Sequence, residues 1–143
     1  MSTTTALILF GLTTALLIGC GKTAEKEPTS GIEALTLSEL VESLSQETKE
    51  VQFCLDEEAG FDSLRQCSTK MQAILDALPG SISSSNLPED KKQKLTADLD
   101  SLKSAYSGLD ESVQSNGSPS KTSKANKKLI DEVKRISKKY SIR

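Results

Sequence analysis

The chain has 143 residues, a length that fits one domain of ordinary size. It contains no histidine, which excludes histidine-based acid–base catalysis, histidine-ligated haem and most zinc sites. Aromatic residues make up 3% of the chain and the net charge is -2, so neither composition nor charge predicts nucleic-acid binding.

An uncharged and largely apolar stretch lies near the N-terminus, over residues 6–19. It is too short for a comfortable membrane span, which needs ~20 residues, and it fits the apolar region of a secretory signal peptide. The stretch ends at Leu17-Ile18-Gly19-Cys20. This tetrapeptide resembles the lipobox of bacterial lipoproteins, in which an aliphatic residue, a tolerant position and a small residue precede the cysteine.

The resemblance implies that residues 1–19 are a cleaved signal peptide and that fatty acyl chains such as palmitate on Cys20 hold the protein on a membrane of the bacterial cell envelope. Gly21 rather than aspartate follows the cysteine, which favours the outer membrane if the source is Gram-negative. The opening MSTTT lacks the lysine or arginine that such signals carry. The alternative is an ordinary signal peptide, or an N-terminal anchor helix, with a chance cysteine.

Residues 20–35 are polar, contain Pro28 and Gly31 and show no periodicity. This composition predicts a lipidated N-terminus followed by a flexible tether, with the folded body over residues 36–143.

Two helices are predicted in the first half of the body. The first, over residues 37–58, begins at a Thr36-x-x-Glu39 capping box, and Gly60 suits a left-handed C-cap. The second begins after a cap at Asp62 and is predicted to stop at Pro79-Gly80, which leaves residues 80–86 as a loop.

Two more helices are predicted in the second half. The third opens around residues 86–90 and stops at Asn116-Gly117, and the fourth has Ser118 as its cap and Pro119 in its first turn. No segment alternates with period two, so we expect an all-α protein, an antiparallel up-down four-helix bundle. The predicted core stripes comprise Leu37, Leu40, Val41, Leu44, Thr48, Val51, Leu55, Leu64, Cys67, Ser68, Met71, Ile74, Leu75, Leu78, Leu95, Leu99, Leu102, Tyr106, Leu109, Val113, Leu129, Ile130, Val133, Ile136 and Tyr140.

Charge is distributed unevenly along the chain. Residues 25–62 carry eleven acidic and two basic side chains, whereas residues 121–143 carry nine basic and two acidic ones. The first and fourth helices are neighbours in an up-down bundle, so complementary charges on their adjacent faces are expected to select this pairing. The competing interpretation is that the basic end faces the anionic membrane or another partner.

Cys54 and Cys67 are equidistant from Gly60-Phe61, so a helical hairpin would place them at the same level. A signal peptide implies an oxidising compartment, and we therefore predict a disulfide between them. Free core thiols, a redox-active pair and a metal site are the alternatives. A catalytic dithiol usually has C-x-x-C spacing at a helix N-terminus, and a metal would need further soft ligands.

The remaining charged clusters predict solvated surfaces. Consecutive helical residues point in different directions, so Asp56-Glu57-Glu58 predicts a solvated helix end rather than a metal site. Lys91-Lys92, Lys127-Lys128 and Lys138-Lys139 have few aromatic residues between them and predict solvated faces rather than a nucleic-acid groove. No catalytic, metal-binding or cofactor-binding residue is predicted.

The helix lengths, the longer middle connection and Lys138-Lys139-Tyr140 beside Arg143 resemble the small soluble periplasmic b-type cytochromes, which are four-helix bundles. Those proteins hold haem with a methionine early in the first helix and a histidine just before the closing motif. Val41 and Ser137 stand at the approximately matching positions, and neither ligates iron. The resemblance therefore implies the fold and not the haem function.

The leading hypothesis is a lipid-anchored, non-catalytic helical protein of the bacterial envelope that binds an unknown envelope partner or has a structural role. A carrier of a small ligand or cofactor inside the bundle is one alternative. An inhibitor-like or immunity-like interaction protein that displays its acidic first helix is the other.

Overall fold

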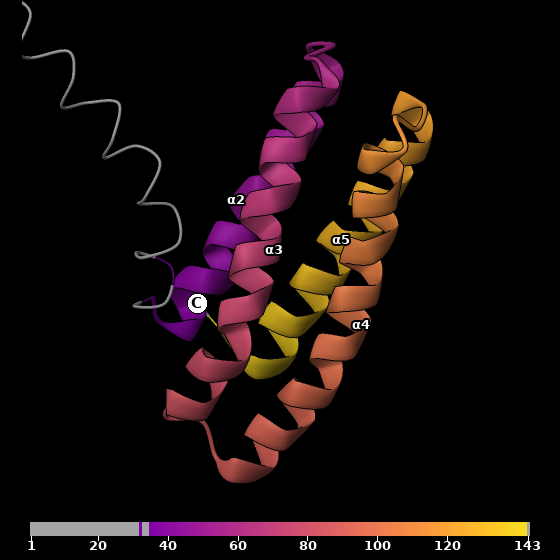
Figure 1. The fold of residues 1–143 in the computed structure, drawn as a ribbon. Coiled ribbons are helices and arrows are strands. Elements are labelled where there is room, and N and C mark those ends of the chain that lie inside the picture. Colours follow the sequence, from indigo (N-terminus) through magenta and orange to yellow (C-terminus); the bar gives the residue numbers. More distant parts are fainter. Residues whose placement is uncertain (1–31, 33–34, 143) are drawn as a thin grey trace, which may run out of the picture.

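A computed structural model describes residue 32 and residues 35–142. Within that part of the chain the secondary structure is four long helices without a strand: α2 (Leu37–Asp56), α3 (Phe61–Ser84), α4 (Glu89–Gln114) and α5 (Pro119–Tyr140). Each helix packs against the next one along the chain, and α2 also packs against α5. The helices run up and down in turn, so the α2–α3 and α4–α5 turns share one end of the molecule (Figure 1). The predicted all-α four-helix bundle is confirmed.

The start of α2 follows the predicted capping box. The Glu39 backbone N–H donates to Thr36 Oγ1 at 3.3 Å, and the Thr36 backbone N–H donates to Glu39 Oε2 at 2.7 Å. Both groups would otherwise lack an intrahelical partner, so this reciprocal pair fixes where the helix begins.

The turn between α2 and α3 differs from the prediction. The helix ends at Asp56 rather than at residue 58, and the left-handed residue is Glu58, with φ 53°, rather than Gly60. Gly60 has φ -59° and is the N-cap of α3, which places Asp62 inside the first turn instead of at the cap. The Ala59 N–H donates to the Cys54 carbonyl at 2.8 Å, so the turn closes earlier than the glycine position suggested.

The predicted end of the second helix at Pro79-Gly80 is wrong, because α3 continues through both residues to Ser84. Ile82 explains the extension, since it continues the buried stripe of Leu75 and Leu78 and is 1% exposed. Burying such a side chain stabilises by about 1.5–3 kcal/mol, which offsets part of the cost of the proline and glycine. Residues 80–84 of the predicted loop over residues 80–86 are therefore helical.

The α4–α5 turn agrees with the prediction. The helix α4 ends at Gln114, Asn116 has a left-handed φ of 51°, and the Ser118 hydroxyl caps α5 by accepting from the Lys121 N–H at 3.3 Å. Gly117 is required by close approach, because a Cβ there would lie 2.5 Å from Ser112 Oγ.

One contiguous core occupies the centre of the bundle and contains nearly all of the predicted stripe. Leu55 and Ile130 are half-buried, and Ile82 is an addition. The first turns of α5 bury Thr122 and Asn126 completely. The buried core residues other than these two are Leu37, Leu40, Val41, Leu44, Thr48, Val51, Leu64, Cys67, Ser68, Met71, Ile74, Leu75, Leu78, Ile82, Leu95, Leu99, Leu102, Tyr106, Leu109, Ser112, Val113, Leu129, Val133, Ile136 and Tyr140.

The neighbourhood of α2 and α5 is confirmed, but their charges do not pair. Across residues 35–142 no ion pair joins these two helices; instead Arg135 and Lys139 of α5 pair with Asp98 of α4 at 3.2 and 2.7 Å. The expectation that α2–α5 charge pairing selects the neighbours is therefore corrected. Shape and two uncharged hydrogen bonds, one of them from Asn126 to the Thr48 carbonyl, connect α2 to α5.

Candidate interaction surface

The predicted anchor lies outside the described residues. This applies to the signal peptide over residues 1–19, to the lipidation site Cys20 and to most of the tether over residues 20–35. Their assignment stays a prediction that the fold neither supports nor opposes.

The two body cysteines are brought together where α2 and α3 pack. Cys67 is buried in the core and Cys54 is half-buried against it, and both are thiols in this structure. Burial, followed by the neighbouring Cys54 and Glu47, raises the pKa of the Cys67 thiol to about 11. The Cys54–Cys67 disulfide stays a prediction, whereas the proximity that it needs is present.

Buried hydroxyl groups form hydrogen bonds between helices that the sequence did not reveal. Ser68 of α3 donates to Asp110 Oδ1 of α4 at 2.7 Å, and the Tyr106 hydroxyl of α4 donates to the Ser68 carbonyl at 3.0 Å. Ser112 and Thr122 pair across α4 and α5 at 2.8 Å. These hydroxyls already have partners inside the bundle, so they hold helices together. Serine and threonine fall within the 3-4 stripes, which was the available signal.

A second polar cluster joins the first half of α4 to the C-terminal end of α5. Asp98 accepts hydrogen bonds from Lys139 Nζ at 2.7 Å and from the Tyr140 hydroxyl at 2.6 Å, and Arg135 lies 3.2 Å away. Burial opposes ionisation of Asp98, but these three hydrogen-bond donors outweigh it and hold its pKa at about 2. Arg135 is also bound to Glu132 at 2.6 Å, so the cluster is internally satisfied.

We expect Asp98→Asn to lower the free energy of unfolding by about 1–2 kcal/mol at pH 7, because it removes a carboxylate whose pKa is depressed by folding. The folded pKa lies below the unfolded one, so this contribution is present above about pH 4 and is lost as the pH falls through about 2. Urea denaturation of both proteins at neutral and acidic pH measures the difference. Asp90→Asn, at an exposed pair with Lys94, is the matched control with little expected effect. A difference independent of pH would contradict the assignment.

The end of the bundle formed by the α2–α3 turn carries the two exposed large apolar side chains of the described part of the chain. Phe53 is 60% exposed in the last turn of α2, and Phe61 is 36% exposed as the first residue of α3. Carboxylates surround them in sequence, and all are exposed: Asp56, Glu57, Glu58 and Asp62. We call these six residues the tip surface.

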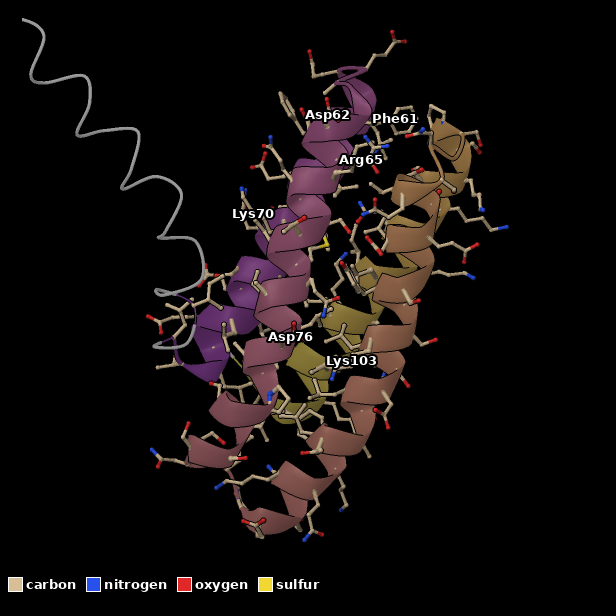
Figure 2. The ribbon with its side chains drawn as sticks, in the orientation of Figure 1. Phe61, Asp62, Arg65, Lys70, Asp76 and Lys103 are labelled. Carbon is tan, nitrogen blue, oxygen red and sulfur yellow. The ribbon has the colours of Figure 1, made fainter. Side chains whose placement is uncertain are left out.

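The tip surface is held by backbone and side-chain contacts beneath it. The Glu57 N–H donates to the Phe53 carbonyl at 2.9 Å, which fixes the last turn of α2. Arg65 donates to Asp62 at 3.1 Å and to Asn116 of the α4–α5 turn at 2.8 Å, so it ties one helical hairpin to the other. Figure 2 shows Phe61, Asp62 and Arg65 together at this end of the molecule.

The sequence pattern indicates the exposure of Phe53. This residue falls between Val51 and Leu55, outside the 3-4 stripe of the first helix. Phe61 carried no such signal, because the start of the second helix was placed after it. The acidic cluster itself is exposed as predicted, and Asp56 accepts a hydrogen bond from Gln52 at 2.8 Å within α2.

Val41 and Ser137, which match the haem-ligand positions only by place, have ordinary structural roles. Val41 is 6% exposed in the core, and Ser137 is half-buried on α5. Between residues 35 and 142, no three acidic or cysteine side chains are grouped so that they could hold a metal ion.

Comparison with protein-family models and with curated proteins finds no match to this sequence. Among the helices that the structure describes, none combines the length and the apolar character needed to cross a membrane.

Proposed function

We propose that this protein is a lipid-anchored, non-catalytic binding module of the bacterial cell envelope, and that the tip surface contacts a basic protein partner. Cys20 is the proposed lipidation site, because it follows an apolar stretch and closes the lipobox-like Leu17-Ile18-Gly19. In this role the protein displays the end of its acidic first helix to a partner, because the tip surface lies where α2 ends.

The observation that carries the binding role is the exposure of Phe53 and Phe61 among four carboxylates. Aromatic side chains are enriched among the residues that dominate the energy of protein interfaces. Leaving them in water gains nothing for the fold, since an exposed phenylalanine forgoes about 1.5–3 kcal/mol of burial. Carboxylates around such anchors favour a partner with lysine or arginine near an apolar pocket, and they speed its approach.

The tip surface lies at the end of the bundle farthest from the point where the tether joins it. The described chain begins at the opposite end of the bundle, where Leu35 precedes α2 (Figure 1). A helix of this length spans about 30 Å. A bundle tethered through Cys20 would therefore present Phe53 and Phe61 at its distal end.

The buried Ser68 hydroxyl and Cys67 thiol have structural surroundings, which supports a non-catalytic role. Ser68 is 1% exposed and its hydroxyl already donates to Asp110. Cys67 is buried with a pKa of about 11, so little of it is thiolate at neutral pH.

Mass spectrometry of the protein extracted from the membranes of its native host tests the anchor. We expect an acylated chain that begins at Cys20, and we expect Cys20→Ala to remain unacylated. A chain that retains Met1, or an unmodified Cys20, would overturn the lipid anchor.

Replacing Phe53 with a photoreactive phenylalanine analogue in the native host tests the tip surface. We expect cross-linking to one protein at a segment rich in lysine or arginine, and weaker cross-linking at high salt. The control position is Gln93, which is exposed near the start of α4 at the other end of the bundle. Equal cross-linking at both positions, or none at position 53, would contradict the proposed contact.

A further inference from the structure

A second surface, unrelated to the tip, runs along the outside of α5. This helix carries eight basic and two acidic side chains, and its buried stripe faces the core. Arg135 and Lys139 are bound to Asp98. The other six basic residues are exposed and, within the described chain, have no ion-pair partner: Lys121, Lys124, Lys127, Lys128, Lys134 and Lys138. We call these six residues the lysine face.

The lysine face has two parts with different surroundings. Lys121, Lys124 and Lys128 line a shallow groove between α4 and α5, where Asp100 and Glu111 stand on the opposite side. The other three lysines do not line that groove: Lys127, Lys134 and Lys138. Their spacing of seven and four residues places them on one outward face of the helix, where their charge is not offset by α4.

The chemistry of this face suits a diffuse layer of negative charge. A lysine ammonium is a hydrated point charge on a flexible stem, whereas arginine provides the planar fork that recognises individual phosphates and carboxylates. The arginine of α5 is occupied by Asp98 and Glu132, and the tyrosine of α5, Tyr140, is buried. The face therefore offers charge without a stacking surface or a bidentate donor for a nucleic acid.

The geometry suits a flat surface. From Lys121 to Lys138 the face extends for about 25 Å along a straight helix. Its Lys138 end lies beside the start of α2, where the chain arrives from Cys20 (Figure 1). Fourteen residues lie between Cys20 and Leu35, enough to reach at most about 50 Å, so a bundle anchored there can lie with α5 against the membrane.

We propose that the lysine face binds the anionic lipid headgroups of the membrane that holds the anchor, and so lays the bundle along that membrane. The proposal rests on the lipid anchor described under the proposed function. Polybasic segments close to an anionic leaflet are attracted within about one Debye length, ~8–10 Å, and the tether is long enough to let the face come within that range. The tip surface stays free in this orientation, because it belongs to the end of α2 and the start of α3.

Lysine labelling of the acylated full chain in vesicles tests this orientation. One set of vesicles contains phosphatidylcholine alone, and the other contains phosphatidylcholine with phosphatidylglycerol. We expect a water-soluble amine reagent to modify Lys127, Lys134 and Lys138 about fivefold more slowly on the anionic vesicles, and high salt to restore the rate. Lys103, which is exposed on α4 and does not line the groove beside α5, is the internal control and should react equally on both (Figure 2).

A variant with Lys127, Lys134 and Lys138 changed to glutamine provides a second measurement. In this variant we expect the remaining lysines of the lysine face, Lys121, Lys124 and Lys128, to lose their protection from the amine reagent on anionic vesicles. A matched variant with Lys49, Lys91 and Lys103 changed to glutamine should keep that protection. The six substituted positions are exposed, so we expect both variants to fold, and circular dichroism checks this.

The outcomes separate the two proposals. A chain that does not float with either vesicle type would overturn the lipid anchor. A chain that floats with both but shows equal labelling of α5 would overturn the lysine face as a lipid-binding surface. Protection that appears only when a soluble polyanion such as heparin is added would also overturn it, and would assign the face to an acidic polymer.

Discussion

We expect Asn126→Asp to lower the free energy of unfolding by about 3–5 kcal/mol at pH 7, a large fraction of the stability of a small bundle. Asn126 is completely buried, and its Nδ2 donates to the Thr48 carbonyl at 2.8 Å while its Oδ1 has no partner within the described structure. Aspartate would place a second oxygen against that carbonyl and bury a negative charge without a partner. Urea denaturation of the two proteins measures the loss.

The pH dependence of this variant has a definite sign. Burial raises the pKa of a carboxyl group, so the folded pKa of the introduced aspartate lies above its unfolded value. The variant is therefore closest to the parent protein at low pH, where the protonated acid can donate to the Thr48 carbonyl, and it loses stability as the pH rises. An equal loss at acidic and neutral pH would show that the introduced group is not buried.

Asn126→Leu is the informative control at the same position. It removes the hydrogen bond from Asn126 Nδ2 to the Thr48 carbonyl together with the unpartnered Asn126 Oδ1. The Thr48 carbonyl remains part of the backbone of α2. We expect stability to be unchanged or raised by about 1 kcal/mol, because replacing a partly satisfied buried polar group with an apolar one of similar shape is often neutral or favourable. Asn86→Asp, at an exposed position between α3 and α4, controls for the charge itself.

The fold could be predicted because apolar spacing decides which face of each helix is buried. The regular leucine stripe of α4, with Tyr106 and Val113, allows only one buried face, and the caps at Thr36 and Ser118 place two helix starts. These signals are local, so they do not depend on what the helix packs against.

The errors arose where tertiary packing overrides a local signal. Pro79 and Gly80 are helix breakers by propensity, yet Ile82 keeps α3 helical because its burial belongs to the whole core. Asn126 is the opposite case, because a polar side chain that the local pattern would leave exposed is buried in α5 by its hydrogen bond to the Thr48 carbonyl of α2. The burial of Ile82 and of Asn126 depends on packing partners that lie in other helices.

The candidate surface could be predicted only in part. The carboxylates at residues 56–58 are apparent from composition, and the equidistance of Cys54 and Cys67 from the turn gave their proximity. The exposure of Phe61 depends on where α3 begins, and that start was set by Gly60 rather than by Asp62. Likewise, the six exposed α5 lysines lack ion-pair partners within the described chain because α2 does not pair with them, and the charge pattern of the sequence does not indicate this.

We expect reduction of a Cys54–Cys67 disulfide to lower the free energy of unfolding by about 3 kcal/mol, the chain-entropy contribution of a loop of this length. The two side chains already adjoin across α2 and α3, which is the proximity that a disulfide needs. Non-reducing peptide mapping of protein from its native compartment identifies the bond. Urea denaturation with and without reductant then measures its contribution.

The pKa of Cys67 also determines when this bond forms. At about 11 it leaves the buried thiol almost entirely protonated at neutral pH, and only the thiolate attacks a disulfide. We therefore expect the folded, reduced protein to be oxidised slowly by a small disulfide at pH 7 and progressively faster as the pH approaches 11, whereas the urea-unfolded chain reacts quickly at pH 7. The variant with both cysteines changed to serine should respond to neither reductant nor oxidant. A native protein whose denaturation midpoint is the same with and without reductant would show that the pair remains as two core thiols.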